Sequence, residues 1–118
     1  VEIDDFAILG GFTLVHQFCK IGAHIITAVG SIILMDIPPY IRVAGDNLKP
    51  NGINIEGLKR RKFSPQVIAD IKKAYKIIYR EGNTIVVAKK MLESLAKKTK
   101  EVNLFIDFID ESNRGLIR

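Results

Sequence analysis

The 118-residue chain contains one cysteine and two histidines, and this scarcity limits the chemistry open to it. A single thiol, Cys19, cannot form an intramolecular disulfide, so we expect a reducing compartment such as the cytoplasm. His16 and His24 lie eight residues apart, which matches no common metal-binding spacing on one element. We therefore expect no metal site.

The sequence also lacks a long apolar run. No stretch of 18 apolar residues occurs, and the most apolar segment, residues 25–35, is too short to cross a bilayer. We therefore expect no membrane span. Few aromatic residues interleave with the lysines and no nucleic-acid-binding motif is present, which argues against a nucleic-acid partner.

Charge is distributed unevenly along the chain. Residues 59–100 carry 13 basic and 3 acidic side chains, a net charge of +10, whereas residues 1–58 and 101–118 are both net acidic. Such a segment attracts an acidic partner. Nucleic acid, a phosphorylated small molecule, anionic lipid and an acidic carrier protein all fit the charge alone.

Apolar or branched residues recur at every sixth position in the first third of the chain. These anchors are Ile3, Leu9, Val15, Ile21, Thr27 and Ile33. Six is the period of a hexapeptide β-solenoid, in which each hexad forms one flat side of a triangular coil. The alternative, an ordinary pair of alternating strands, does not account for so many successive intervals of six.

Each anchor is expected to point into the coil and to stack on its counterpart three hexads away, which contributes about 1.5–3 kcal/mol per buried side chain. We expect small residues at the corners, because glycine in particular tolerates the backbone angles of a bend. Val1 opens in mid-pattern, and two coils are fewer than repeat stacks usually need. We interpret residues 1–118 as the carboxyl-terminal part of a longer protein.

The remaining chain is predicted to form a connector and a helical domain. Two prolines in residues 36–40 should stop the regular pairing, with one short further strand at 41–43 and turns at 45–47 and 50–52. The predicted parts are the last coils and exit strand at 1–45, a substrate-binding loop at 46–63 and a helical domain at 64–118.

Three helices are predicted in the last part. Ser64 before Pro65 is a helix start, and Thr84 caps a second helix. A third helix is expected at about 102–112. The predicted apolar faces are Val67, Ile68, Ile71, Ala74, Tyr75, Ile78 and Tyr79, then Val87, Met91, Leu92 and Leu95, then Phe105, Phe108 and Ile109.

Polar residues that favour ligand binding concentrate just before these helices. Asn54 and Glu56 alternate with isoleucines and should share one side of an extended segment, where an amide and a carboxylate can read a base or sugar edge. Arg60 and Arg61 can hold phosphate through paired hydrogen bonds. The alternative to ligand binding is that these residues form a solvent-exposed run of charges at the start of a helix. His16 should point away from the coil, and His24 is interpreted as structural.

Several segments resemble one particular family of hexapeptide-repeat enzymes. These segments are residues 10–19, 37–40, 54–61, 74–80 and 114–118. They are similar to the acyl-carrier-protein–UDP-N-acetylglucosamine O-acyltransferases that open lipid A biosynthesis. The resemblance implies a left-handed parallel β-helix followed by helices, a homotrimer, and transfer of an (R)-3-hydroxyacyl group to the sugar 3-hydroxyl. The acyl donor is acyl carrier protein with its phosphopantetheine arm, and no further cofactor is implied.

The resemblance also implies roles for individual residues. Gln17 matches a position that contacts the nucleotide sugar, and His16 matches one that lines the substrate-binding site. A block that holds the uridine and diphosphate from a neighbouring subunit is matched by Asn54, Glu56, Arg60 and Arg61. The basic face Lys72, Lys73, Lys76 and Arg80 would receive the acidic carrier protein. The general-base histidine of the family lies upstream, so no catalytic residue is expected in this chain.

Two positions depart from the family pattern. Val29 stands where some members have glycine beside the acyl cleft, and Asn47 stands where others have a histidine near the far end of the acyl chain. Two other functions remain open from the sequence: the related lipid A N-acyltransferase, and a non-catalytic module for trimerisation and carrier-protein binding.

Overall fold

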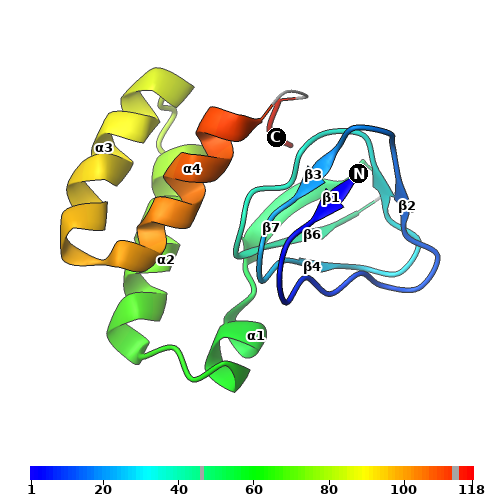
Figure 1. The fold of residues 1–118 in the computed structure, drawn as a ribbon, viewed down its shortest axis with the longest axis horizontal. Helices are drawn as coiled ribbons and strands as arrows, with labels where there is room; N and C mark the ends of the chain where they lie inside the picture. The colour runs from blue at the N-terminus through cyan, green and yellow to red at the C-terminus, as the bar shows by residue number, and fades with distance from the viewer. Residues whose placement is uncertain (46, 113–114) are drawn as a thin grey trace.

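A computed structural model describes residues 1–45, 47–112 and 115–118. Mostly short parallel strands form one half of the molecule, and three helices form the other half: α2 (Pro65–Tyr79), α3 (Ile85–Lys98) and α4 (Asn103–Glu111) (Figure 1). A short helix, α1 (Ile55–Arg60), lies beneath the junction. Asp46 in the predicted turn and connector, and Arg114 in the closing segment, lie outside the described residues.

The strands pair in parallel at the predicted spacing. β1 (Glu2–Ile3) pairs with β3 (Lys20–Ile21) and β2 (Leu14–Val15) pairs with β5 (Ile32–Ile33), and each partner lies 18 residues further along the chain. Eighteen residues are three hexads, so the predicted stacking of each hexad on the third one after it is confirmed.

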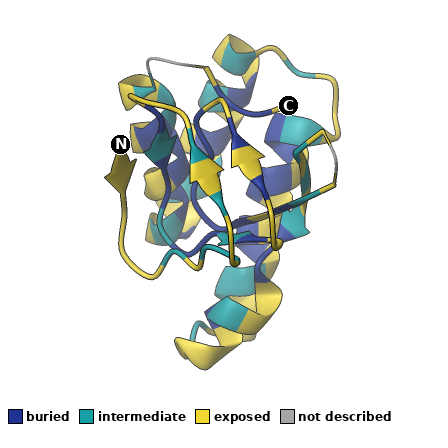
Figure 2. Ribbon diagram, turned by 90° about the vertical axis from the view of Figure 1, so that its right-hand side faces the viewer, coloured by how far each residue is buried: buried dark blue, intermediate teal, exposed yellow. Residues whose placement is uncertain are grey.

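The anchors are buried where a further coil covers them. Ile21, Thr27 and Ile33 are buried, whereas Leu9 and Val15 are half-buried. The prediction is wrong for Ile3, which is 52 % exposed because no described part of the chain packs beneath it. The outward faces of β2 and β5 are exposed, and they face the viewer in Figure 2.

The corners of the coil are built differently from the prediction. Left-handed backbone angles, with φ between 57° and 67°, occur at Phe6, Phe12, Phe18 and His24, again every sixth residue. Gly10 and Gly22 are needed for close packing instead. A Cβ on Gly22 would lie 2.4 Å from the backbone nitrogen of Pro39, and one on Gly10 would lie 2.7 Å from the backbone of Ala28.

The regular pairing continues past the two prolines, contrary to the prediction. Ile37 forms a parallel bridge with Ile21, and β6 (Ile41–Ala44) pairs in parallel with β4 (Ile26–Thr27). The offset falls from 18 to 16 residues, so the chain has shortened one side of the coil by two residues. The predicted short strand near residues 41–43 is confirmed.

A second strand follows where turn residues were expected. β7 (Lys49–Ile53) runs antiparallel to β6 with a register irregularity, and it includes the Pro50-Asn51-Gly52 segment predicted as a turn. Pro50 is accommodated because β7 lies at the edge of its sheet, where one row of backbone groups needs no partner strand.

The helical half follows the predicted caps. α2 (Pro65–Tyr79) begins after Ser64, whose side chain accepts a hydrogen bond from the Val67 amide, and α3 (Ile85–Lys98) begins after Thr84 in the same way. The third segment divides into η1 (Lys100–Val102) and α4 (Asn103–Glu111). The predicted faces of α2 and α4 pack into the core around Ile71, Ala74 and Phe105.

The predicted apolar face of α3 is wrong in part. Leu92 is buried as predicted, but Val87 and Met91 are 46 % and 39 % exposed, and Ala88 is buried in their place. The helix is therefore rotated from the expected orientation. α3 contacts both α2 and α4, and its buried side is the one that carries Ala88 and Leu92.

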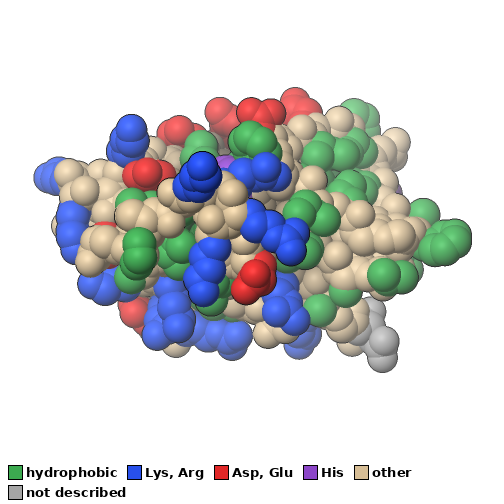
Figure 3. Space-filling view, turned by 90° about the horizontal axis from the view of Figure 1, so that it is seen from below, with side chains coloured by type: hydrophobic (Ala, Val, Ile, Leu, Met, Phe, Trp, Pro, Cys, Tyr) green, Lys and Arg blue, Asp and Glu red, His purple; other side chains and the backbone are tan. Residues whose placement is uncertain are grey.

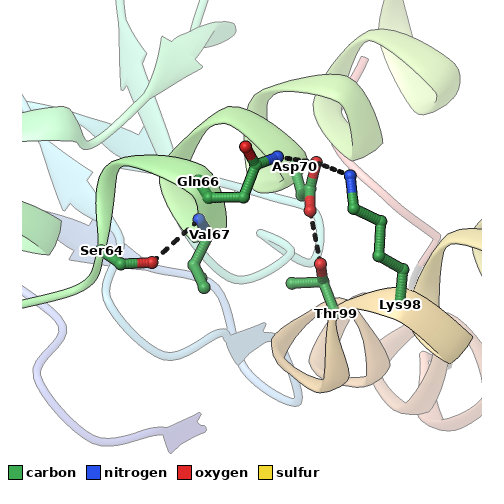
Figure 4. A network of polar contacts seen from close by, with 6 residues as sticks. All are labelled: Ser64, Gln66, Val67, Asp70, Lys98 and Thr99. Carbon is green, nitrogen blue, oxygen red and sulfur yellow. Dashed lines mark hydrogen bonds and ion pairs between the residues drawn. The ribbon is translucent and has the colours of Figure 1, made fainter.

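A buried carboxylate joins the two longest helices. Asp70 of α2 is fully buried, and it accepts hydrogen bonds from the hydroxyl of Thr99 and, at 3.2 Å, from the side chain of Gln66 (Figure 4). The Nζ of Lys98 lies 3.6 Å away. These contacts hold the end of α3 against α2, and the sequence pattern did not indicate them.

Candidate functional site

The polar block at residues 54–61 is helical rather than extended. α1 (Ile55–Arg60) begins after Asn54, whose Oδ1 accepts a hydrogen bond from the Gly57 amide at 3.2 Å. The Nδ2 of Asn54 donates to the backbone carbonyl of His24 at 3.0 Å. The expectation that Asn54 and Glu56 share one side of a strand is therefore wrong, because the Asn54 amide is an effective helix cap.

Asn54 and Glu56 nevertheless line one cleft. Its volume is about 520 Å³, and it lies between strands β4, β6 and β7 and the start of α1. The residues that line it are Ile26, Thr27, Ala28, Arg42, Val43, Ala44, Ile53, Asn54, Ile55 and Glu56. Arg42 supplies a cation to this cleft. A single arginine in a short strand carries no pattern, so the sequence alone did not indicate this residue.

The two arginines of the block lie at the other end of α1. Arg60 is the last helical residue, and Arg61 ends the helix with its guanidinium carbon 3.9 Å from the centroid of the Phe6 ring. Lysine and arginine side chains gather on the face seen from the side of α1, whereas hydrophobic side chains gather over the coil (Figure 3). Of the three arginines Arg42, Arg60 and Arg61, Arg42 is the one that lines the cleft.

The other predicted nucleotide-sugar residues lie elsewhere. His16 and Gln17 are exposed at the corner after β2, and neither lines the cleft with Asn54 and Glu56. One copy of the chain therefore does not bring the two predicted sets together. His16 points away from the coil interior, as predicted.

Val29 and Asn47, the two predicted acyl-cleft positions, are both exposed. Val29 is 77 % exposed and points outward from the corner after β4. An outward side chain at this position changes the shape of the surface without changing the core.

His24 is a structural residue in this fold. Its ring is stacked between Phe6 and Tyr40, with Phe63 edge-on to it. Burial and then the positive charge of Arg61 lower the pKa of His24, and the carboxylate of Asp5 opposes them. The ring is therefore neutral near pH 7 and is enclosed by other rings.

The predicted carrier-protein patch lies along α2. Lys72, Lys73 and Lys76 are exposed on this helix, and Arg80 follows its last turn. The guanidinium of Arg80 donates a hydrogen bond to the hydroxyl of Tyr75 at 3.1 Å. Arg80 is thus partly held in place by this hydrogen bond, and the three lysines extend the cationic surface along the exposed side of α2.

Within residues 1–45, 47–112 and 115–118, no group of three or more histidine, cysteine, aspartate or glutamate side chains is arranged to hold a metal ion. The helices of this described part are also too short or too polar to cross a membrane.

Comparison with known proteins finds a matching family model and similar sequences. The family model described as "Udp N-acetylglucosamine O-acyltransferase; Domain 2" matches residues 36–117. An acyl-[acyl-carrier-protein]–UDP-N-acetylglucosamine O-acyltransferase of Thiobacillus denitrificans is 50 % identical over 117 residues, which cover 99 % of this chain and 45 % of that protein. The chain thus spans under half the length of this relative.

Solved structures agree closely with the fold. The UDP-N-acetylglucosamine acyltransferase of Francisella novicida superposes with a TM-score of 0.95 at 42 % identity, over 98 % of this chain and 43 % of that one. The Arabidopsis UDP-N-acetylglucosamine acyltransferase gives a TM-score of 0.86 at 28 % identity, over 98 % of this chain and 44 % of that one. The chain belongs to the UDP-N-acetylglucosamine O-acyltransferase family.

Proposed function

We propose that the intact protein containing this chain transfers an (R)-3-hydroxyacyl group from acyl carrier protein to the 3-hydroxyl of UDP-N-acetylglucosamine, the first step of lipid A biosynthesis. The observation that carries this proposal is the 50 % identity, over 99 % of the chain, to a relative named as an acyl-[acyl-carrier-protein]–UDP-N-acetylglucosamine O-acyltransferase. The named O-acyltransferase relatives favour this activity over the related N-acyltransferase.

In this proposal the cleft beside α1 holds the nucleotide. Asn54 and Glu56 line it and would hydrogen-bond the uridine, while Arg60 and Arg61 at the other end of α1 would hold the diphosphate. Arg42 lines the same cleft and would add a further positive charge beside the ligand.

A second subunit would complete the site. His16 and Gln17 lie outside the cleft, so their proposed contact with the sugar requires another copy of the chain. Several large apolar side chains of the coil are exposed and would be covered in a homotrimer. They include Phe12, Leu14, Phe18, Val29, Ile32 and Leu34. We infer that the parallel coils form a left-handed β-helix at the centre of this trimer.

The chemistry needs a base that this chain is not proposed to supply. The sugar hydroxyl attacks the thioester carbonyl of the acyl donor, an ester forms, and the phosphopantetheine thiol leaves. A general base within hydrogen-bond reach of that hydroxyl takes its proton. His24 is enclosed by rings, and His16 is assigned to binding, so we place the base on an upstream coil. Val29 and Asn47 would line the path of the acyl chain.

The acyl donor would dock on α2. Lys72, Lys73, Lys76 and Arg80 form an exposed cationic face, which is suited to an acidic carrier protein and raises its rate of encounter. The proposed compartment is the cytoplasm, where the buried thiol of Cys19 would stay reduced.

The test is a transfer assay with the intact protein, acyl carrier protein charged with 3-hydroxyacyl groups, and UDP-N-acetylglucosamine. Glu56→Gln should raise the KM for the nucleotide sugar about tenfold with little change in kcat, because it removes a charged hydrogen-bond acceptor. Lys72→Glu with Lys76→Glu should raise the KM for the carrier protein only. Lys90→Glu with Lys97→Glu, an exposed double charge reversal on α3, is the matched control.

Absence of the acylated product from the intact protein would overturn the proposed activity. If carrier protein still bound under those conditions and an unrelated polyanion did not displace it, the result would indicate the non-catalytic module instead.

A further inference from the structure

Three stacked rings occupy one corner of the coil next to α1. The rings of Phe6 and His24 stack at 5.1 Å, and those of His24 and Tyr40 stack at 5.6 Å. We call these three residues the corner column. The guanidinium carbon of Arg61 lies 3.9 Å from the centroid of the Phe6 ring, so Arg61 extends the same stack.

The corner column is held from several directions. All three residues have left-handed backbone angles, with φ of 60°, 62° and 70°. The His24 amide donates to the carbonyl of Asp5 at 3.0 Å, and the Tyr40 amide donates to the carbonyl of Ala23 at 2.8 Å. The hydroxyl of Tyr40 donates to the carbonyl of Glu101 at 2.8 Å. The Phe6 ring is therefore presented to Arg61 at a defined place.

Contact with the Phe6 ring leaves the N–H donors at the edge of the Arg61 guanidinium available to a ligand. A guanidinium that lies over an aromatic face is attracted by the ring and still points its N–H donors outward in one plane. That plane is the geometry in which arginine forms paired hydrogen bonds to phosphate. His24, next in the column, is neutral near pH 7, so it adds no charge that would repel Arg61.

We propose that Phe6 is a positioning residue, which orients the Arg61 guanidinium for the diphosphate of the nucleotide sugar. This inference rests on the proposed function. It assigns a role to a residue of the first hexads that neither the repeat pattern nor the polar block indicated. Phe12 has the same kind of backbone angle but is 90 % exposed, so the role belongs to the contact with Arg61 rather than to the corner position.

The experiment is a double-mutant cycle in the intact protein, with the Kd for UDP-N-acetylglucosamine measured by calorimetry. Phe6→Leu should weaken binding about threefold to tenfold, because it removes the aromatic face beneath the cation. Phe6→Tyr keeps that face and should bind within about twofold of wild type. In an Arg61→Gln background, Phe6→Leu should have no further effect. Steady-state kinetics should show the change in KM for the nucleotide sugar, with kcat unchanged.

The outcomes separate the two proposals. If wild type does not bind UDP-N-acetylglucosamine, the proposed function and this inference both fail. If wild type binds and Phe6→Leu does not weaken binding, only the inference fails. It also fails if Phe6→Leu weakens binding equally in the Arg61→Gln background, since Phe6 would then act on the fold and not through Arg61. Thermal melts monitor folding, and Phe6→Met replaces Phe6→Leu should the leucine variant not fold.

Discussion

Asp70 provides a test of what holds the helical half together. Its carboxylate is fully buried, and the hydroxyl of Thr99 and the amide of Gln66 donate to it. Hydrogen bonds to a charged group contribute about 1.5–3 kcal/mol each, against about 0.5–1.5 kcal/mol for neutral ones. Lys98 adds little, because its side chain is 58 % exposed and water screens the ion pair.

Asp70→Asn keeps the size of the side chain and removes the charge. Asparagine can accept from one neighbour and donate to the Thr99 hydroxyl, so neutral hydrogen bonds replace the charged ones. We expect the free energy of opening α2 and α3 to fall by about 2 kcal/mol at pH 7. Native-state hydrogen exchange of the amides in these helices measures this quantity. Asp107→Asn, which changes an exposed carboxylate of α4, should change it by less than about 0.5 kcal/mol.

The loss of stability caused by Asp70→Asn should depend on pH, and the pKa of Asp70 determines the direction. The hydrogen bond from Thr99 is the main cause that lowers the pKa of Asp70; burial opposes it, and Lys98 and Gln66 lower the pKa further. Because the folded-state pKa lies below the unfolded value, the stabilisation is complete above about pH 4 and is lost as the pH falls through the folded-state pKa. The difference between wild type and Asp70→Asn should thus be constant from pH 7 to pH 5 and shrink below about pH 4. A difference under about 0.5 kcal/mol at pH 7, or one undiminished in acid, would refute the reasoning.

Three further substitutions, one of them with a paired control, test the coil and the site. Gly22→Ala should cost about 3 kcal/mol or more, because its Cβ would lie 2.4 Å from the nitrogen of Pro39, whereas Gly11→Ala, with nothing within 4 Å, should be tolerated; thermal melts of both variants decide this. Asn54→Ala removes the cap of α1 and a buried hydrogen bond, so the opening free energy of α1 should fall by about 1–2 kcal/mol in hydrogen exchange. Val29→Gly removes an outward side chain and should lengthen the preferred acyl chain in a competition between carrier proteins of different acyl length; an unchanged preference contradicts a role for Val29 in the cleft.

The strand pairing was predictable because burial repeats with the coil. One anchor in every six residues has no other simple explanation, and the pairing of Leu14 with Ile32 follows from that period. The helix starts were equally predictable, since the side chains of Ser64 and Thr84 cap the helices that follow them. These features depend on local chemistry that a sequence displays directly.

The errors arise where a tertiary contact outweighs a local preference. Pro50 and Gly52 are typical turn residues, yet the edge of the β6 sheet holds them in β7. The isoleucines beside Asn54 alternate like a strand, yet the helix cap and the bond to the His24 carbonyl favour α1. Six helical residues are too few to produce a recognisable period, so this part of the candidate site was placed in the wrong geometry.

The corner residues show why a repeat predicts the fold better than the site. A left-handed angle in a residue other than glycine costs about 1–2 kcal/mol. The coil sustains that cost because backbone hydrogen bonds to the neighbouring coils hold both sides of each corner. The side chains at the first corners, Phe6, Phe12 and Phe18, do not enter the core, so the fold places little demand on their identity, whereas His24 and Tyr40 are buried at later corners. Phe12 and Phe18 are exposed, whereas the ring of Phe6 contacts the guanidinium of Arg61. Since the period constrains only the anchors, the residues that carry function are free to differ from one hexad to the next, and contacts alone distinguish them.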